Sequence, residues 1–131
     1  MAVAQTKAAS YIQEHTEEIS SHQIISLLMD GALERIEQAV HAHKTENLLD
    51  LQILTHKLVA IINGLRNSLN MDAGGEIAEN LEALYEYMIE RITQSDLTAL
   101  VPALVECRQL LNEVKQGWDQ MSLQSIAVPS L

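Results

Sequence analysis

The histidines and acidic residues of this chain are its first candidates for metal chemistry. A di-iron site in a helical bundle needs Glu-x-x-His on each of two helices, and the sequence contains no Glu-x-x-His. His41 and His43 are two residues apart, which places them about 200° apart around a helix. One helix cannot direct both rings at one metal ion, so we expect them to be solvated surface residues. The sequence predicts no metal site.

Nucleophilic chemistry finds equally little support. Cys107 is the single cysteine and falls on an apolar stripe, where a thiol acts as a small hydrophobic side chain. A nucleophile would need exposure and a nearby base. Gly74 and Gly75 lack the Lys-Ser/Thr that completes a phosphate-binding loop, so we interpret them as a chain corner. We predict no catalytic residue and no cofactor, and hence a protein that is not an enzyme.

One catalytic alternative is a histidine phosphotransfer module, which is also an acidic four-helix bundle with a reactive His on an exposed helical face. His56, followed by Lys57, is the one candidate position. Such modules need a small Gly shortly after the His so that the phosphoryl group can approach, and here no glycine occurs before Gly64. The alternative stays open, and labelling of His56 by a phosphodonor would support it.

The composition indicates a single helical domain. A chain of 131 residues can build one hydrophobic core, and its apolar fraction of 47% includes no Phe. We therefore expect a core of Leu, Ile, Val, Ala and Met, most of which favour helices. The formal charge of −10 repels phosphate backbones and anionic lipid heads. We expect no binding to nucleic acid or to membrane surfaces.

The cysteine count and the apolar runs also bear on location. With one cysteine no internal disulfide can form, which is typical of a reducing compartment. Residues 1–10 contain no apolar signal region, and no stretch reaches about eighteen uninterrupted apolar residues. We therefore expect a cytoplasmic protein with no membrane insertion.

Four apolar stripes at helical spacing predict four helices. Ser20 and Gln23 match a capping box and predict the start of the first helix. Gly74 can take the left-handed conformation that ends a helix, and Gly75 is then expected to open the third. The fourth helix is expected to start at Thr98 or, alternatively, at Asp96. The predicted ranges are residues 20 to about 44, 47–69, 75–93 and 98–121.

These four segments are joined by short connections, so the economical fold is an all-α, antiparallel up-down-up-down four-helix bundle. The bundle is expected to span residues 20–121. Residues 1–19 are predicted to be a flexible N-terminal tail, in which Tyr11 and Ile12 could dock back on the bundle. Residues 122–131 are predicted to be a flexible C-terminal tail.

Some apolar residues lie off the predicted core stripes. On the second helix they form a strip between about 160° and 220° from Leu51, and on the third they flank the predicted core stripe of Ile77, Leu81, Leu84 and Met88. Either the second helix is buried on both sides, or its second strip stays open as a groove for a partner helix. The residues predicted to form this groove are Leu49, Ile53, Ala60, Gly64, Ala78, Tyr85, Ile89, Val101 and Val105. A homodimer that buries the same strips is the structural alternative.

Two blocks of the sequence resemble a known family. The first is Ser20-Ser21-His22-Gln23-Ile24-Ile25 followed by Leu28-Met29-Asp30-Gly31-Ala32. The second is Gly74-Gly75-Glu76-Ile77-Ala78-Glu79-Asn80-Leu81, continued by Leu84-Tyr85-Glu86-Tyr87-Met88. Both blocks in this order, with Trp118 at the expected distance, are similar to the flagellin-export chaperone family (FliS).

The resemblance implies a cytosolic chaperone that binds the disordered C-terminal segment of flagellin and prevents its polymerisation before secretion. It also implies docking on the export gate protein of the flagellar secretion apparatus. Tyr11 matches a family tyrosine in the N-terminal segment, which can cover part of the cargo groove and is linked to gate docking. Ser21 and Met29 depart from the family, which often has Pro and an aromatic residue at these positions.

Overall fold

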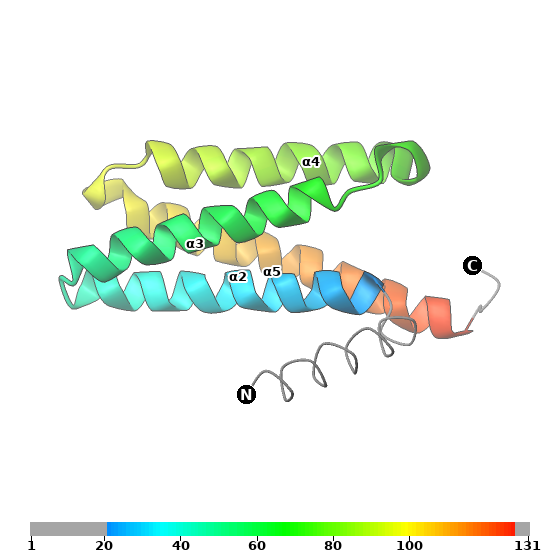
Figure 1. Ribbon diagram of the computed structural model, residues 1–131, viewed down its shortest axis with the longest axis horizontal. Coiled ribbons are helices and arrows are strands. Elements are labelled where there is room, and N and C mark those ends of the chain that lie inside the picture. The colour runs from blue at the N-terminus through cyan, green and yellow to red at the C-terminus, as the bar shows by residue number, and fades with distance from the viewer. Residues whose placement is uncertain (1–20, 128–131) are drawn as a thin grey trace, which may run out of the picture.

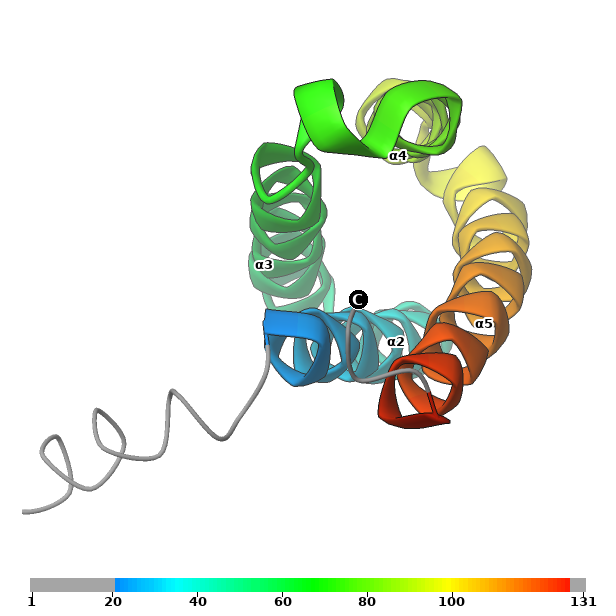
Figure 2. The ribbon, with the colours of Figure 1, turned by 90° about the vertical axis from the view of Figure 1, so that its right-hand side faces the viewer.

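The computed structural model describes the backbone of residues 21–127 and the side chains of residues 21–121, and this part of the chain forms four helices and no strand. The helices are α2 (Ser21–Lys44), α3 (Leu48–Asn67), α4 (Met71–Gln94) and α5 (Leu97–Ala127). Each helix packs antiparallel against the next, and α2 also packs against α5, so the four enclose one core (Figures 1 and 2). The predicted all-α, up-down-up-down bundle is confirmed. The predicted N-terminal tail and the Ser20 cap lie outside the described residues.

The connection between α2 and α3 follows the prediction. The side-chain oxygen of Asn47 accepts a hydrogen bond from the amide of Asp50 at 3.2 Å and caps α3. Glu46, just before it, has a φ of 59°, which lets the chain reverse within a few residues. The predicted start of this helix near Asn47 is confirmed.

The corner between α3 and α4 differs from the prediction. Asn70 caps one helical turn, residues 71–74, by accepting a hydrogen bond from the amide of Ala73 at 3.1 Å. Gly75 then takes φ 54° and ψ −130°, a conformation that L side chains rarely adopt, and the main part of α4 follows. The residue with positive φ is therefore Gly75 and not Gly74. The glycine pair predicts the position of the corner correctly, but the prediction missed the capped turn before it.

The fourth helix starts at the second of its two predicted positions and ends later than predicted. Asp96, and not Thr98, caps α5, because its carboxylate accepts hydrogen bonds from the amide of Ala99 at 2.9 Å and from the hydroxyl of Thr98 at 2.7 Å. At the other end the helix continues past Met121 to Ala127. The predicted C-terminal tail is thus wrong for residues 122–127, and residues 128–131 lie outside the described residues.

The core contains apolar side chains from all four helices, and no charged side chain of the described residues is buried. Leu, Ile, Met and Ala predominate, as the composition predicts. The fully or almost fully buried residues in this cluster are Met29, Ala32, Ile36, Ala39, Ala42, Leu51, Leu58, Ile62, Leu65, Tyr85, Met88, Ile92, Leu100, Leu104, Cys107 and Leu111.

Candidate functional site

Cys107 lies in the core, as predicted. Its side chain is fully buried, and its sulfur lies 3.9 Å from the carbonyl oxygen of Met88. Burial raises the pKa of the Cys107 thiol to about 11. Since the thiolate is the reactive form, this position favours packing over nucleophilic chemistry.

Three of the described histidines, His41, His43 and His56, lie on α2 and α3. His41 and His56 are exposed, and a ring nitrogen of His43 lies 2.8 Å from the carbonyl oxygen of Leu97. His56 borders a cleft of about 320 Å³ between α3 and the end of α4. Among the described residues, no three His, Cys, Asp or Glu side chains are placed to hold a metal ion.

The outer strip of α3 is open to solvent. Leu49 is 69% exposed and Ile53 is 45% exposed, and Ala60 is exposed as well. Gly64 is half-buried at the edge of the same strip, while Leu58 on the opposite side of the helix is fully buried. Of the two interpretations of this helix, the structure therefore supports the open strip.

A cleft of about 670 Å³ lies beside this strip, between α2 and α3. Ile53, Leu54 and Ala42 supply its apolar lining, and charged side chains such as Asp50 and Lys57 lie around them. This mixture of apolar lining and polar rim is typical of a surface that binds a peptide or a partner helix.

Sequence reasoning missed the residues that α2 adds to this surface. Ile24 is 43% exposed and Leu27 is 66% exposed. Both share a side of α2 with Gly31, whose α-carbon faces Ile61 of α3, because the spacings i+4 and i+7 return to one side of a helix. That spacing, off the predicted core stripe, was the available signal. We call the whole surface the α2–α3 face; it consists of Ile24, Leu27, Gly31, Leu49, Ile53, Ala60 and Gly64.

The inter-helix ion pairs between described residues lie on the other flanks of the bundle. Ion pairs join α3 to α4, α4 to α5 and α2 to α5, whereas no ion pair between described residues joins α2 to α3. On the α2–α3 face, exposed apolar side chains therefore occur where no ion pair between described residues joins the two helices. The inter-helix pairs are Arg66–Glu86 at 2.6 Å, Arg66–Glu82 at 3.5 Å, Arg91–Glu106 at 2.8 Å, Arg108–Glu37 at 2.7 Å and Lys115–Asp30 at 3.3 Å.

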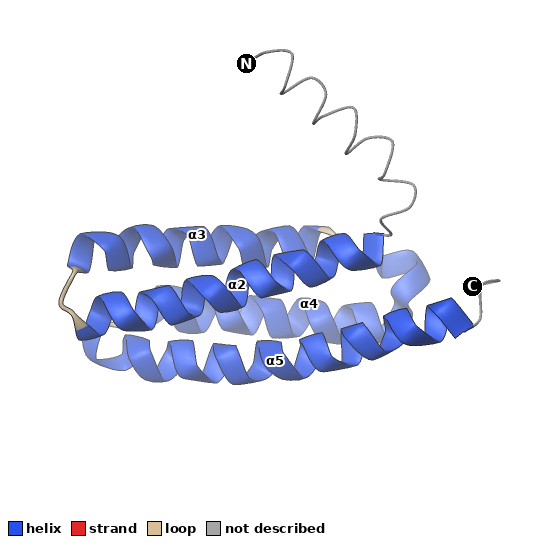
Figure 3. Ribbon diagram, turned by 90° about the horizontal axis from the view of Figure 1, so that it is seen from below, coloured by secondary structure: helices blue, strands red, loops and turns tan. Residues whose placement is uncertain are grey.

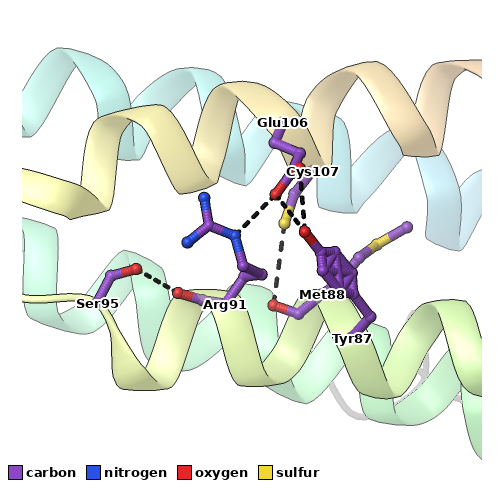
Figure 4. A network of polar contacts seen from close by, with 6 residues as sticks. All are labelled: Tyr87, Met88, Arg91, Ser95, Glu106 and Cys107. Carbon is purple, nitrogen blue, oxygen red and sulfur yellow. Dashed lines mark hydrogen bonds and ion pairs between the residues drawn. The ribbon is translucent and has the colours of Figure 1, made fainter.

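Figure 4 shows the clamp between α4 and α5. Glu106 of α5 accepts hydrogen bonds from Nε of Arg91 at 2.8 Å and from the hydroxyl of Tyr87 at 2.9 Å. The contact with Arg91, followed by that with Tyr87, lowers the pKa of the Glu106 carboxyl. The hydrogen bond to Glu106 raises the pKa of Tyr87. These groups satisfy one another, so this clamp holds the helices together.

Two residues of the predicted groove lie in the core instead. Ala78 is 3% exposed and Tyr85 is 1% exposed, and burial raises the pKa of Tyr85 to about 12. Ile77, which was predicted to be buried, is 64% exposed. Met88 of the predicted stripe is fully buried, and Leu81 and Leu84 pack half-buried against the core. The buried face of α4 is thus turned by only about half a residue, or roughly 50°, from the prediction. The apolar arc of this helix is so wide that the sequence alone does not define the centre of its buried face.

The remaining predicted groove residues lie on other flanks. Ile89 and Val101 are half-buried, and Val105 is 37% exposed. Ile89 is one turn from Glu86, which pairs with α3, and Val105 is one turn from Arg108, which pairs with α2. None of the three residues lines the cleft that contains Ile53. Tyr11 and Ile12 lie outside the described residues.

Comparison with known proteins decides the family. The family model of the flagellar protein FliS matches residues 3–125. The chain belongs to the FliS family. Its relatives include the flagellar secretion chaperone FliSB of Pseudomonas aeruginosa, which is 42% identical over 111 residues, covering 85% of this chain and 88% of the relative.

Two further FliS relatives match over similar lengths. The flagellar secretion chaperone FliS of Vibrio cholerae is 36% identical over 102 residues, covering 78% of this chain and 75% of the relative. That of Salmonella typhimurium is 36% identical over 104 residues, covering 79% and 77%. The family resemblance expected from the two sequence blocks is confirmed.

One helix of this FliS family member has an unusually apolar composition. By its length and apolar composition alone α3 could cross a membrane, although only a minority of its residues are buried inside the bundle. Core helices of water-soluble bundles meet the same criterion. Here α3 packs between α2 and α4, and Arg66 near its end pairs with Glu86. We interpret its high hydropathy as the sum of a buried face and an exposed apolar strip.

Proposed function

We propose that this chain is a cytoplasmic flagellar export chaperone that binds the disordered C-terminal segment of flagellin on the α2–α3 face and has no enzymatic activity. A bound segment could not take part in filament assembly, so flagellin would stay unpolymerised until secretion. The observation that carries the proposal is the coincidence on one flank of exposed aliphatic side chains, a cleft with a polar rim around Ala42, Ile53 and Leu54, and no inter-helix ion pair between described residues. The names of the FliS relatives, all flagellar secretion chaperones, support it.

The chemistry of the face suits a client that folds as it binds. A disordered segment loses conformational entropy on binding, at a cost of about 2–5 kcal/mol or more, so a long apolar contact has to offset that cost. Leu27, Leu49 and Ile53 offer exposed aliphatic area. Ala60 is small and exposed, and a Cβ added at Gly64 would meet no atom within 4 Å, so both leave room for a client helix to lie close to the backbone. We therefore expect the client to lie along α2 and α3 as an amphipathic helix.

Of the predicted groove, we keep Leu49, Ile53, Ala60 and Gly64 as direct contacts. Ala78 and Tyr85 are excluded, because both are buried in the core. Ile89, Val101 and Val105 would be reached only by a client long enough to wrap onto the neighbouring flanks, and we propose them as secondary contacts.

Titration calorimetry with a peptide of the flagellin C-terminal segment tests the face. Ile53→Asp and Leu27→Asp are each expected to weaken binding at least about tenfold, because each places a charge against an apolar helix. Ile77→Asp is the matched control, since Ile77 is an equally large exposed aliphatic residue on α4. Equal losses in all three variants, or none in the first two, would refute the assignment.

We further propose that the chaperone and its client dock on the flagellar export gate protein, with Tyr11 and Ile12 contributing. The support is the family tyrosine at position 11 in the sequence. Deleting residues 1–15 is expected to tighten peptide binding if this segment covers the client site, and to abolish capture of the soluble domain of the gate protein. Unchanged affinity in both assays would reject this role. Light scattering of the free chaperone tests the homodimer alternative, because a homodimer would have twice the mass of the single chain.

A further inference from the structure

The start of α2 and the last part of α5 are joined by a set of reciprocal contacts. The indole nitrogen of Trp118 donates a hydrogen bond to the carbonyl oxygen of His22 at 2.9 Å, and the ring Nε2 of His22 contacts the carbonyl oxygen of Trp118. The two rings stack with centroids 4.4 Å apart and planes 6° apart. Each residue thus holds the other through both its ring and its backbone.

Polar contacts extend this junction on both sides. The Ser26 hydroxyl donates a hydrogen bond to the Asp119 carboxylate at 2.8 Å. Lys115 lies 2.7 Å from Asp119 and 3.3 Å from Asp30 of α2. These contacts lower the pKa of Asp119, mainly through Lys115, and raise the pKa of Lys115, mainly through Asp119. Together with the stacked rings they form what we call the latch: His22, Ser26, Asp30, Lys115, Trp118 and Asp119.

Beyond the latch α5 continues for about two more turns. His22 contacts Trp118, and the helix runs on to Ala127. Figures 1 and 3 both show the end of α5 extending beyond the first described residues of α2. Asp119 is the last residue of α5 with a described polar contact to the bundle. The latch is therefore the last described polar junction between α5 and the bundle before Ala127.

A weak point in the helix lies directly before the latch rings. Gly117 is exposed, and a Cβ added there would meet no atom within 4 Å. Neither close packing nor a positive φ requires glycine at this position. Glycine in a helix interior destabilises the helix relative to alanine, so the helix is easiest to open here.

We propose that residues 118–127 form an arm that opens about Gly117 when the latch breaks, while the rest of the bundle stays folded. Ile25 and Val114 lie one turn from the latch rings and pack half-buried against the core. Opening uncovers these two residues and frees the first turn of α2, to which the N-terminal segment of the chain is joined. The closed form hides this apolar surface and the open form exposes it. The inference is independent of the flagellin client.

Hydrogen exchange of the full-length protein, measured by mass spectrometry, tests the arm. His22→Ala removes the ring stack and one of the reciprocal contacts, so amides of residues 118–127 are expected to exchange about tenfold faster. Amides in the middle of α2, α3 and α5 are expected to keep their rates. Gly117→Ala is expected to slow exchange in the arm. Glu86→Gln, which weakens the distant pair with Arg66, is the matched control and is expected to leave the arm unchanged.

Quenching of Trp118 by acrylamide gives a second readout, because it is the chain's single tryptophan. His22→Ala is expected to increase quenching, and Gly117→Ala is expected to decrease it. Ordinary fraying of a helix end would leave arm exchange insensitive to His22→Ala, and that result would overturn the proposal. Acceleration throughout the bundle would also overturn it, because the latch would then belong to the global fold. Faster exchange in Gly117→Ala would reject the hinge.

Discussion

Replacement of Tyr85 by alanine separates a core residue from a binding residue. Tyr85 is 1% exposed and packs in the cluster that also contains Met88 and Ile92. Removing an aromatic ring from such a site costs about 3–5 kcal/mol in the free energy of unfolding. For a domain of this size each kcal/mol lowers the melting temperature by about 3–4 °C. Tyr85→Ala is therefore expected to melt about 10–20 °C below the wild type.

Circular dichroism during thermal unfolding measures this difference, and Tyr85→Phe is the control that keeps the ring. Tyr85→Phe is expected to melt near the wild type at neutral pH. Because burial raises the pKa of Tyr85 to about 12, the neutral phenol is favoured in the folded state. Its contribution is complete below the unfolded-state pKa near 10 and is lost as the pH rises towards 12. A melting temperature for Tyr85→Ala within about 2 °C of wild type would refute the core placement, since a large buried ring cannot be removed so cheaply.

Three further predictions concern other positions. Burial raises the pKa of Cys107 to about 11 from the ordinary 9.0, so alkylation by iodoacetamide at neutral pH should be at least about a hundredfold slower than that of a free thiol; a comparable rate would contradict the buried position. Gly75→Ala forces a Cβ onto a residue with a φ of 54° and should lower the free energy of unfolding by about 1–3 kcal/mol in urea titrations, whereas an unchanged midpoint would exclude the kink. Hydrogen bonds from Thr98 and Ala99 lower the pKa of Asp96, so its stabilising effect holds at neutral pH and is lost as the pH falls below the ordinary carboxyl range. Asp96→Ala should therefore melt lower than wild type at neutral pH, with the two curves converging in acid; a constant gap would count against the cap.

Local signals in the sequence predict much of this fold. Asn47 is a good N-cap directly before an apolar stripe, and it does cap α3. Cys107 shares a helical stripe with Leu104 and Leu111, and all three are buried. Periodicity and short connections together favour the up-down bundle, because short connections force successive helices to be antiparallel. Each of these inferences depends on neighbours within one or two helical turns.

The inferences that failed depend on tertiary context. The apolar arc of α4 includes both Ile77 and Ala78, and only the positions of α3 and α5 decide that Ala78 faces the core. Asp96 and Thr98 both suit an N-cap by residue type, so the choice between them rests on the path of the connection. Predicting the α2–α3 face would have required the rotation of both helices about their axes, which the sequence does not give. Ion pairs such as Arg108–Glu37 join residues far apart in the sequence, and a single sequence does not reveal them.

Three of the four helix-helix contacts in the bundle include ion pairs, whereas the contact between α2 and α3 includes none between described residues. Raising the ionic strength to about 1 M shortens the screening length to about 3 Å, which weakens the exposed pairs on the three charged flanks. Contacts between α2 and α3 are apolar and keep their strength in salt. Concentrated salt should therefore weaken the attachment of α4 and α5 to their neighbours slightly, by up to about 1 kcal/mol for each exposed pair, and should leave the contact between α2 and α3 unchanged. The chaperone therefore keeps its α2–α3 face at an ionic strength that weakens the ion pairs elsewhere in the bundle.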